Sequence, residues 1–162
     1  MPGLPFGAAQ QHGVPEDVRG YDGIVGIEFV EFDADLPCPR SVAYRRVDGG
    51  AGMRVRANAP EIAQFALSEQ QARAYLDTLA ASGLFSWQRV YRPAQGTFVN
   101  ASTQWRLEVT FARRKGQARV RPFRVEGENV FPDDYEAVLE LLMAPAGGAC
   151  AVAGEQPCGE RG

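Results

Sequence analysis

Arginine is the residue type whose placement in this sequence most clearly suggests chemistry. Residues 89–125 carry a net charge of +8 and residues 38–58 carry +4, whereas residues 1–37 carry −6 and residues 126–162 carry −7. A guanidinium group donates hydrogen bonds in a planar fork that matches carboxylate and phosphate oxygens. The charge segregation therefore predicts a surface for an anionic partner on the helix-free face of a sheet. The candidate binding residues on that face are Arg54, Arg56, Arg106, Arg119 and Arg121.

A second interpretation of the same arginines needs no ligand. The basic segments would lie beside the acidic first strand and Glu108, and the charges would form cross-strand ion pairs on a solvated face. Such pairing also accounts for the small net charge of −3. From the sequence alone we favour this interpretation over a binding face.

Carboxylates offer the other possible chemistry. Glu31, Asp33 and Asp35 follow one another at a spacing of two, so they would project together if the first strand extends that far. Neighbouring carboxylates can share a proton or bind a cation. A charged strand end that discourages edge-to-edge aggregation is the interpretation we favour. A small enzyme that uses carboxylates and arginine, without histidine or metal, remains the alternative function.

The remaining reactive residues exclude more than they suggest. His12 is the only histidine, and a catalytic base must come within about 3 Å of its nucleophile. Cys38, Cys150 and Cys158 lack the Cys-x-x-Cys spacing of zinc sites. Their odd number is typical of a reducing compartment, so we expect free thiols, although Cys150 and Cys158 could close a small loop. We find no phosphate-binding loop or nucleophile motif, and predict no catalytic residue, metal or cofactor in a cytoplasmic protein.

Length and composition indicate one soluble domain. The 162 residues are 45% hydrophobic and 23% charged, and no apolar run approaches the ~18 residues that cross a membrane. A pI near 5.2 argues against nucleic acid as the partner. Residues 1–20 and 145–162 are rich in glycine and proline and bury little, so we expect flexible ends around a folded unit at 21–144.

Apolar periodicity predicts the elements that position these residues. Ser68 and Gln71 have the spacing of a capping box, and Gly83 stands where a left-handed residue would end the helix. Pro132 occupies the favoured first position of a second helix. The predicted strands cover 24–32, with a bulge near Phe29, then 41–47, 52–57, 105–111 and 117–125, and the first helix covers 69–82.

This order predicts an α+β fold, because no strand–helix–strand alternation is present. We expect a single antiparallel sheet of about five strands, in the order strand, hairpin, helix, hairpin, helix, with both helices packed on one face. The helix stripes would form the core with the inward side of the sheet.

The strand that starts at Trp105 and the run Gly127-Glu128-Asn129-Val130-Phe131-Pro132 resemble a pattern in small uncharacterised bacterial α+β proteins. In those proteins a Trp-led strand is followed by a Gly-x-Asn-x-x-Pro turn and a C-terminal helix. The similarity covers about residues 67–142 and implies a fold but no activity or site residues. Taken together, the sequence predicts a non-catalytic binding module for a protein, peptide or anionic partner.

Overall fold

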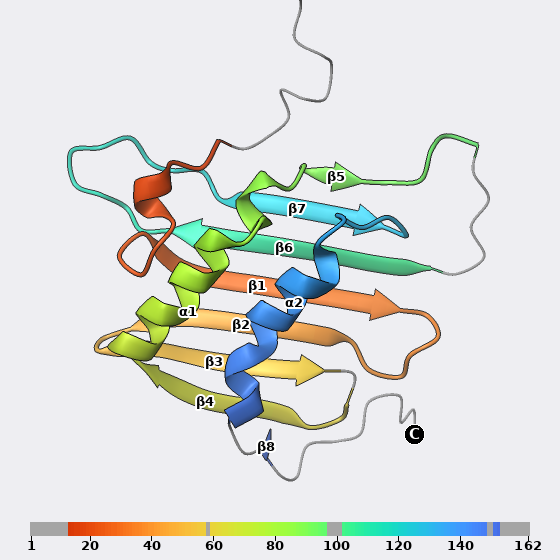
Figure 1. Ribbon diagram of the computed structural model, residues 1–162, viewed down its shortest axis with the longest axis horizontal. Helices are drawn as coiled ribbons and strands as arrows, with labels where there is room; N and C mark the ends of the chain where they lie inside the picture. Colours follow the sequence, from red (N-terminus) through yellow and green to blue (C-terminus); the bar gives the residue numbers. More distant parts are fainter. Residues whose placement is uncertain (1–12, 58, 97–101, 149–150, 153–162) are drawn as a thin grey trace, which may run out of the picture.

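One mixed sheet with two helices on one face makes up the protein (Figure 1). The computed structural model describes residues 13–57, 59–96, 102–148 and 151–152. The sheet has eight strands in the order β5-β7-β6-β1-β2-β3-β4-β8. The strands are β1 (Ile24–Asp33), β2 (Arg40–Val47), β3 (Gly50–Ala57), β4 (Ile62–Ser68), β5 (Val90–Tyr91), β6 (Thr103–Phe111), β7 (Phe123–Glu128) and β8 (Ala151–Val152).

The sheet is larger than the expected five strands. Neighbouring strands are antiparallel except β5, which runs parallel to β7. β4 was missing from the expectation because Ile62 and Ala66 are apolar residues on its more exposed face, opposite Ala63, Phe65 and Leu67, so the sequence lacks a clear alternation there. β5 and β8 have two residues each, too few for any periodicity. The α+β class is confirmed, whereas the expectation of a purely antiparallel, five-stranded sheet is wrong.

Both long helices cover the same face of the sheet, as predicted. α1 (Glu69–Ala81) begins with the expected capping box, in which Ser68 Oγ accepts from Gln71 N at 3.1 Å. α2 (Tyr135–Met143) packs beside it, and Tyr75 Oη donates to the carbonyl oxygen of Leu142 at 2.8 Å. The buried stripes of the two helices are Ala72, Tyr75, Leu76 and Leu79, and Tyr135, Val138, Leu139 and Leu142. No described helix is long and apolar enough to cross a membrane.

Two details at the helix and strand ends differ from expectation. Gly83 has φ −77°, so it is not a left-handed cap; it is instead required because a Cβ there would lie 2.2 Å from Asp134 Oδ2. The irregularity of β1 lies between Ile24 and Gly26 in its pairing with β6, not near Phe29. The alternation near Phe29 slips because Val30 is half-buried on the opposite face.

The packed unit extends beyond the expected limits of 21–144. Val14 and Val18 are buried in the core, and Val18 ends a short 3-10 helix, η2 (Glu16–Val18). After α2 the chain continues into η4 (Ala144–Gly148) and β8, which pairs with β4. The third short 3-10 helix among the described residues is η3 (Leu84–Ser86), after α1. Residues 1–12 and 153–162 lie outside the described residues.

Candidate functional site

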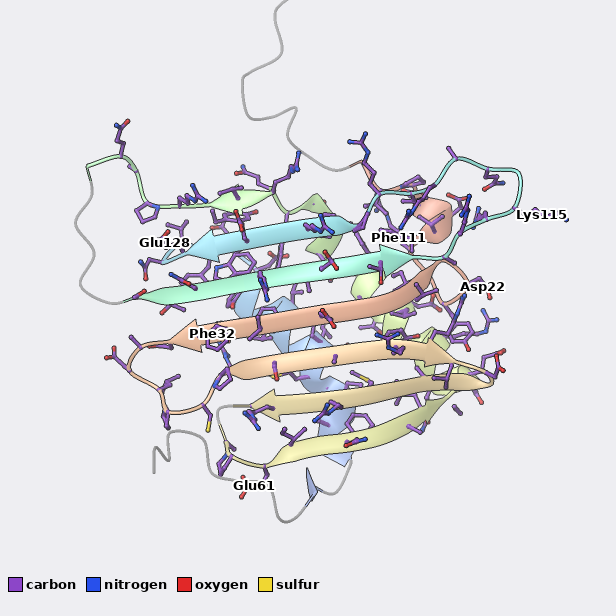
Figure 2. All side chains as sticks on the ribbon, turned by 180° about the vertical axis from the view of Figure 1, so that it is seen from behind. Asp22, Phe32, Glu61, Phe111, Lys115 and Glu128 are labelled. Carbon is purple, nitrogen blue, oxygen red and sulfur yellow. The ribbon has the colours of Figure 1, made fainter. Side chains whose placement is uncertain are left out.

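The face of the sheet opposite the helices, here called the open face, carries the polar half of every long strand (Figure 2). In β1, the side chains of Ile27 and Phe29 are buried toward the helices, and those of Glu28 and Val30 alternate with them. The same alternation places Arg54 of β3 on the open face. The strand periodicity of two thus separates the core from the candidate site.

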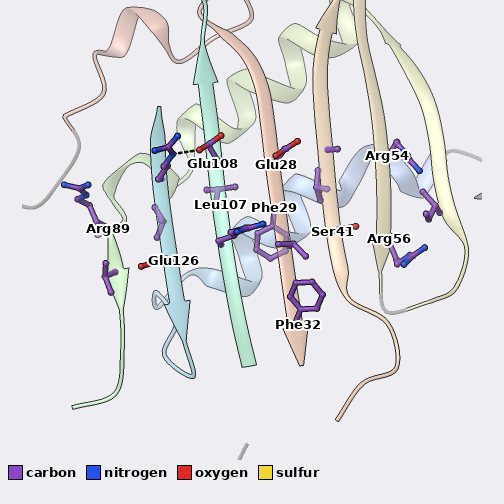
Figure 3. A pocket seen from close by; sticks show the side chains of 18 residues that line it. Glu28, Phe29, Phe32, Ser41, Arg54, Arg56, Arg89, Leu107, Glu108 and Glu126 are labelled. Carbon is purple, nitrogen blue, oxygen red and sulfur yellow. Dashed lines mark hydrogen bonds and ion pairs between the residues drawn. The ribbon is translucent and has the colours of Figure 1, made fainter. Parts of the chain in front are cut away.

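The open face is hollowed over its central strands (Figure 3). The hollow encloses about 850 Å³, and a second hollow of about 350 Å³ adjoins it, sharing Val30, Phe32, Arg106 and Glu126. Three of the five predicted binding residues, Arg54, Arg56 and Arg106, line the larger hollow. The other charged residues that line it are Arg89, Arg124, Glu28, Glu108 and Glu126.

Part of this charge is neutralised within the sheet. Arg124 of β7 donates from Nε to Glu108, its register partner on β6. Arg92 Nη2 lies 3.5 Å from Glu126 Oε1. The bond between Arg124 and Glu108 is the cross-strand pairing that the second interpretation predicted, whereas Arg92 lies beyond the end of β5. Exposed pairs of this kind contribute about 0–1 kcal/mol each.

The three arginines predicted for the hollow are not neutralised in this way. The side chains of Arg54, Arg56 and Arg106 make no hydrogen bond or ion pair with any residue that the structure describes. The Nε atom of Arg56 is buried and has no acceptor. A buried N–H without an acceptor is costly, because it has lost water and gained no partner. These guanidinium groups are available to an anion that enters the hollow.

The strand register fixes how far apart these arginines stand. Arg106 of β6 pairs with Val30 of β1, Val30 pairs with Ser41 of β2, and Ser41 pairs with Arg56 of β3. Arg106 and Arg56 therefore belong to one row, separated by three strand spacings of about 4.8 Å, or about 14 Å between backbones. Arg54 stands two residues from Arg56 on the same face of β3 (Figure 3).

The other two predicted binding residues lie elsewhere. Arg119 and Arg121 are exposed in the connection between β6 and β7, because β7 begins only at Phe123, after Pro122. The prediction of a strand over 117–125, and with it the placement of these two arginines on the sheet, is wrong. Within that connection Arg114 forms an ion pair with Asp17, with 2.8 Å between Arg114 Nη1 and Asp17 Oδ2.

The predicted carboxylate cluster is divided among different roles. Glu31 is buried among the inward-facing residues of β1 and accepts two hydrogen bonds from Arg40, at 2.8 and 2.7 Å. Asp33 accepts instead from the backbone N–H of Asp35 in the turn after β1, at 2.9 Å. Glu31 is therefore not a solvated strand end, and the described residues contain no cluster of acidic, histidine or cysteine side chains suited to a metal.

Glu31 and Arg40 dock α2 onto the sheet. The hydroxyl of Tyr135 also donates to Glu31, and Arg40 bonds Glu136 at 3.1 and 3.2 Å. Burial and then the hydrogen bond to Glu31 raise the pKa of Tyr135 well above its usual value. Burial lowers the pKa of Arg40, but its hydrogen bonds to Glu31 and Glu136 outweigh burial and raise it above its usual value. The sequence does not predict this network, because its members come from separate segments.

Both tryptophans belong to the core. Trp87 and Trp105 meet edge to face with ring centroids 5.7 Å apart, and both contact the ring of Tyr135. Their indole N–H groups are satisfied, by Asp134 Oδ1 at 2.7 Å and by the carbonyl oxygen of Val130 at 3.0 Å. These rings support the start of α2 and leave no indole for a ligand.

The cysteines differ from expectation. Cys38 is buried in the connection between β1 and β2 and is disulfide-bonded, so it is not the incidental thiol that the odd count suggested. The cysteine bonded to Cys38 falls outside the described residues. The same is true of the expected loop between Cys150 and Cys158, and of His12.

Comparison with known proteins gives no independent guide to this site. No family model, curated protein or solved structure matches the chain. The resemblance to bacterial proteins with a Gly-x-Asn-x-x-Pro turn stays a prediction. The turn itself is present: Asn129 adopts φ 58°, and its side chain accepts from Thr103 N at 2.8 Å.

Proposed function

We propose that the protein is a non-catalytic binding module that holds an anionic protein or peptide on the open face of its sheet. The observation that carries the proposal is the hollow lined by Arg54, Arg56 and Arg106, none of which has a partner among the described residues. Arg124 bonds Glu108, its register partner, whereas Arg106 forms no ion pair with its own register partner Glu126, which pairs with Arg92 instead. The register partners of Arg54 and Arg56 are uncharged. Unpaired guanidinium groups beside a hollow can donate hydrogen bonds to the carboxylate oxygens of a partner molecule.

The chain supplies a matched pair of variants for the test. R54Q/R56Q/R106Q removes three positive charges from the hollow, and R113Q/R119Q/R121Q removes three from the exposed connection between β6 and β7. R113Q/R119Q/R121Q should keep the wild-type melting temperature, because exposed side chains away from special contacts change stability by about 0.5 kcal/mol or less. R54Q/R56Q/R106Q should keep or slightly raise it, because it also removes the buried Nε of Arg56 that has no acceptor.

The assay measures binding of a fluorescently labelled oligoglutamate peptide by fluorescence anisotropy at low and at physiological salt. It distinguishes binding at the hollow from a general attraction to the positive charge of the protein. We expect the hollow variant to lose binding and the connection variant to retain most of it. Equal losses in both would mean that net charge alone attracts the peptide, and the proposal would be wrong. E28Q should tighten binding, because Glu28 is the one carboxylate in the hollow without a partner among the described residues.

A catalytic role is the second candidate, and one observation favours it. Glu28 and Glu108 are register partners across β1 and β6, so two carboxylates stand side by side in the hollow next to Arg106. Such a pair can transfer protons to and from a bound group. Turnover of a carboxylate, phosphate or glycosidic substrate that E28Q abolishes while the fold persists would favour the enzyme over the binding module.

Location in the cytoplasm also stays a prediction, and the disulfide of Cys38 argues against it. Disulfides persist in oxidising compartments and are rare where glutathione keeps thiols reduced. Alkylation of the protein from its native cells, with and without prior reduction, tests this. A Cys38 thiol that reacts without reduction would support the cytoplasm.

A further inference from the structure

We infer that the partner is an acidic, amphipathic α-helix that lies along β1 and β2, between the arginines of β6 and those of β3. This inference rests on the proposed function and specifies the occupant of the same hollow. It follows from the charge of the hollow, the nature of its floor, the state of the sheet backbone and the width between the arginines.

The unpaired charge of the hollow selects an acidic partner. Among the described residues that line it, Arg54, Arg56, Arg89 and Arg106 have no charged partner, against Glu28 alone on the acidic side. Arg89 stands beyond β7 and Arg54 on β3, so positive charge flanks the central strands on both sides (Figure 3). An occupant with carboxylates along both of its flanks would pair with both sides.

The floor between these arginines is low and partly apolar. Val30 of β1 and Ala43 of β2 are half-buried there and are its apolar members, whereas Ser41, opposite Val30, and Glu28, opposite Ala43, are its polar members. At the end of β1, Phe32 is 57% exposed, a large apolar side chain without a cover in the described chain. An occupant that places apolar side chains on this floor would remove it from water, at about 25 cal/mol per Å².

The backbone of β1 has no free hydrogen-bonding groups for the occupant. β1 pairs in register with β2 on one side and with β6 on the other, so its N–H and C=O groups are already bonded. An extended peptide laid on this face would lose water from its own backbone groups and gain no partner, which is costly. A helix bonds its own backbone, and the opposite face of this sheet is covered by helices for the same reason.

The dimensions agree with a helix. The row from Arg106 to Arg56 spans about 14 Å between backbones, which leaves room for a helix about 10–12 Å wide. A cylinder of that kind that fills the 850 Å³ hollow is about two turns long. The occupant would therefore present one apolar stripe of about two turns, with glutamate or aspartate on either side of it.

Three synthetic probes of equal charge test the inference on the full-length protein. The first is a side-chain-stapled helix with a leucine stripe flanked by glutamates, the second has the same composition with prolines that prevent a helix, and the third is a single-stranded oligonucleotide. We expect the stapled helix to bind at least about tenfold more tightly than the proline peptide. R54Q/R56Q/R106Q should weaken the stapled helix by about tenfold or more, which three partly exposed ion pairs can supply, and R113Q/R119Q/R121Q should not.

The outcomes separate this inference from the proposed function. Equal binding of the stapled and proline peptides, lost in the hollow variant, would overturn the helix and leave an anion-binding face. Binding of neither peptide would overturn both proposals. An oligonucleotide that binds more tightly than the stapled helix, and loses that affinity in the hollow variant, would make the face a nucleic-acid site and overturn the inference.

Discussion

Replacing Arg40 by methionine tests whether the buried pair with Glu31 holds α2 on the sheet. The side chain of Glu31 is only 5% exposed, so without Arg40 its charge would stay buried with the Tyr135 hydroxyl as its remaining side-chain donor. Breaking a buried pair by removing one partner costs about 3–5 kcal/mol. We expect R40M to lower the free energy of unfolding by that amount at pH 7, measured by urea denaturation.

The double variant E31Q/R40M gives the sharper comparison. Glutamine removes the buried charge and keeps an oxygen that can accept from the Tyr135 hydroxyl, so it should recover more than half of the loss caused by R40M. R45M is the control, since Arg45 is exposed on the same strand and has no partner among the described residues. A loss below about 1 kcal/mol in R40M, or losses that simply add in the double variant, would refute the reasoning.

Three further substitutions test the core and the close contact at Gly83. Burial raises the pKa of Tyr44 to about 12, above the value of about 10 in the unfolded chain. Its contribution to the free energy of unfolding should therefore be constant below about pH 10 and be lost between pH 10 and 12. Y44F should remove part of that fall in urea denaturation at each pH and cost little at pH 7, because the Tyr44 hydroxyl is buried without a partner. Y75F should cost about 1–3 kcal/mol at pH 7, because it leaves a carbonyl of α2 without its donor; an equal effect in both tyrosine variants would contradict this. G83A should cost about 1–3 kcal/mol in thermal melts, because the new Cβ must displace Asp134, whereas G147A meets open space and should not.

The parts of the fold that were predictable depend on signals within one segment. The capping box of Ser68 and Gln71 fixes the start of α1, and the alternation after Trp105 fixes β6. The same alternation correctly placed Arg54, Arg56 and Arg106 on the helix-free face. A strand's faces follow from a period of two, whatever its neighbours are.

The rest depends on contacts between distant segments. Glu31 is in phase with Ile27 and Phe29, a signal that it points inward, but nothing local indicates that Arg40 and Tyr135 will meet it there. A charged residue on the inward face of a strand needs a partner, and the sequence does not name one.

The error over Arg119 and Arg121 has a different cause. Arginines alternate with apolar residues on both sides of Pro122, but the alternation changes phase there, because Arg119 and Arg121 have the same parity as the buried Phe123 and Val125. The predicted strand over 117–125 overlooked this break. Proline removes a backbone donor from a ladder, and here the strand starts directly after it. The hollow itself was not predictable, because its width comes from the register of four strands.

The position of β1 at the middle of the sheet has a consequence for the order of folding. β1, β2, β3 and β4 are neighbours in both sequence and space, so their hairpins can close over short loops. The pairing of Phe29 with Leu107 must instead join β1 to β6 across β2, β3, β4 and α1. Long-range strand pairing is slow because the entropy of closing the intervening chain is lost before the contacts form. We therefore expect the joining of the β5–β7–β6 half to β1 to limit the rate of folding, and the hollow, which needs both halves, to form last.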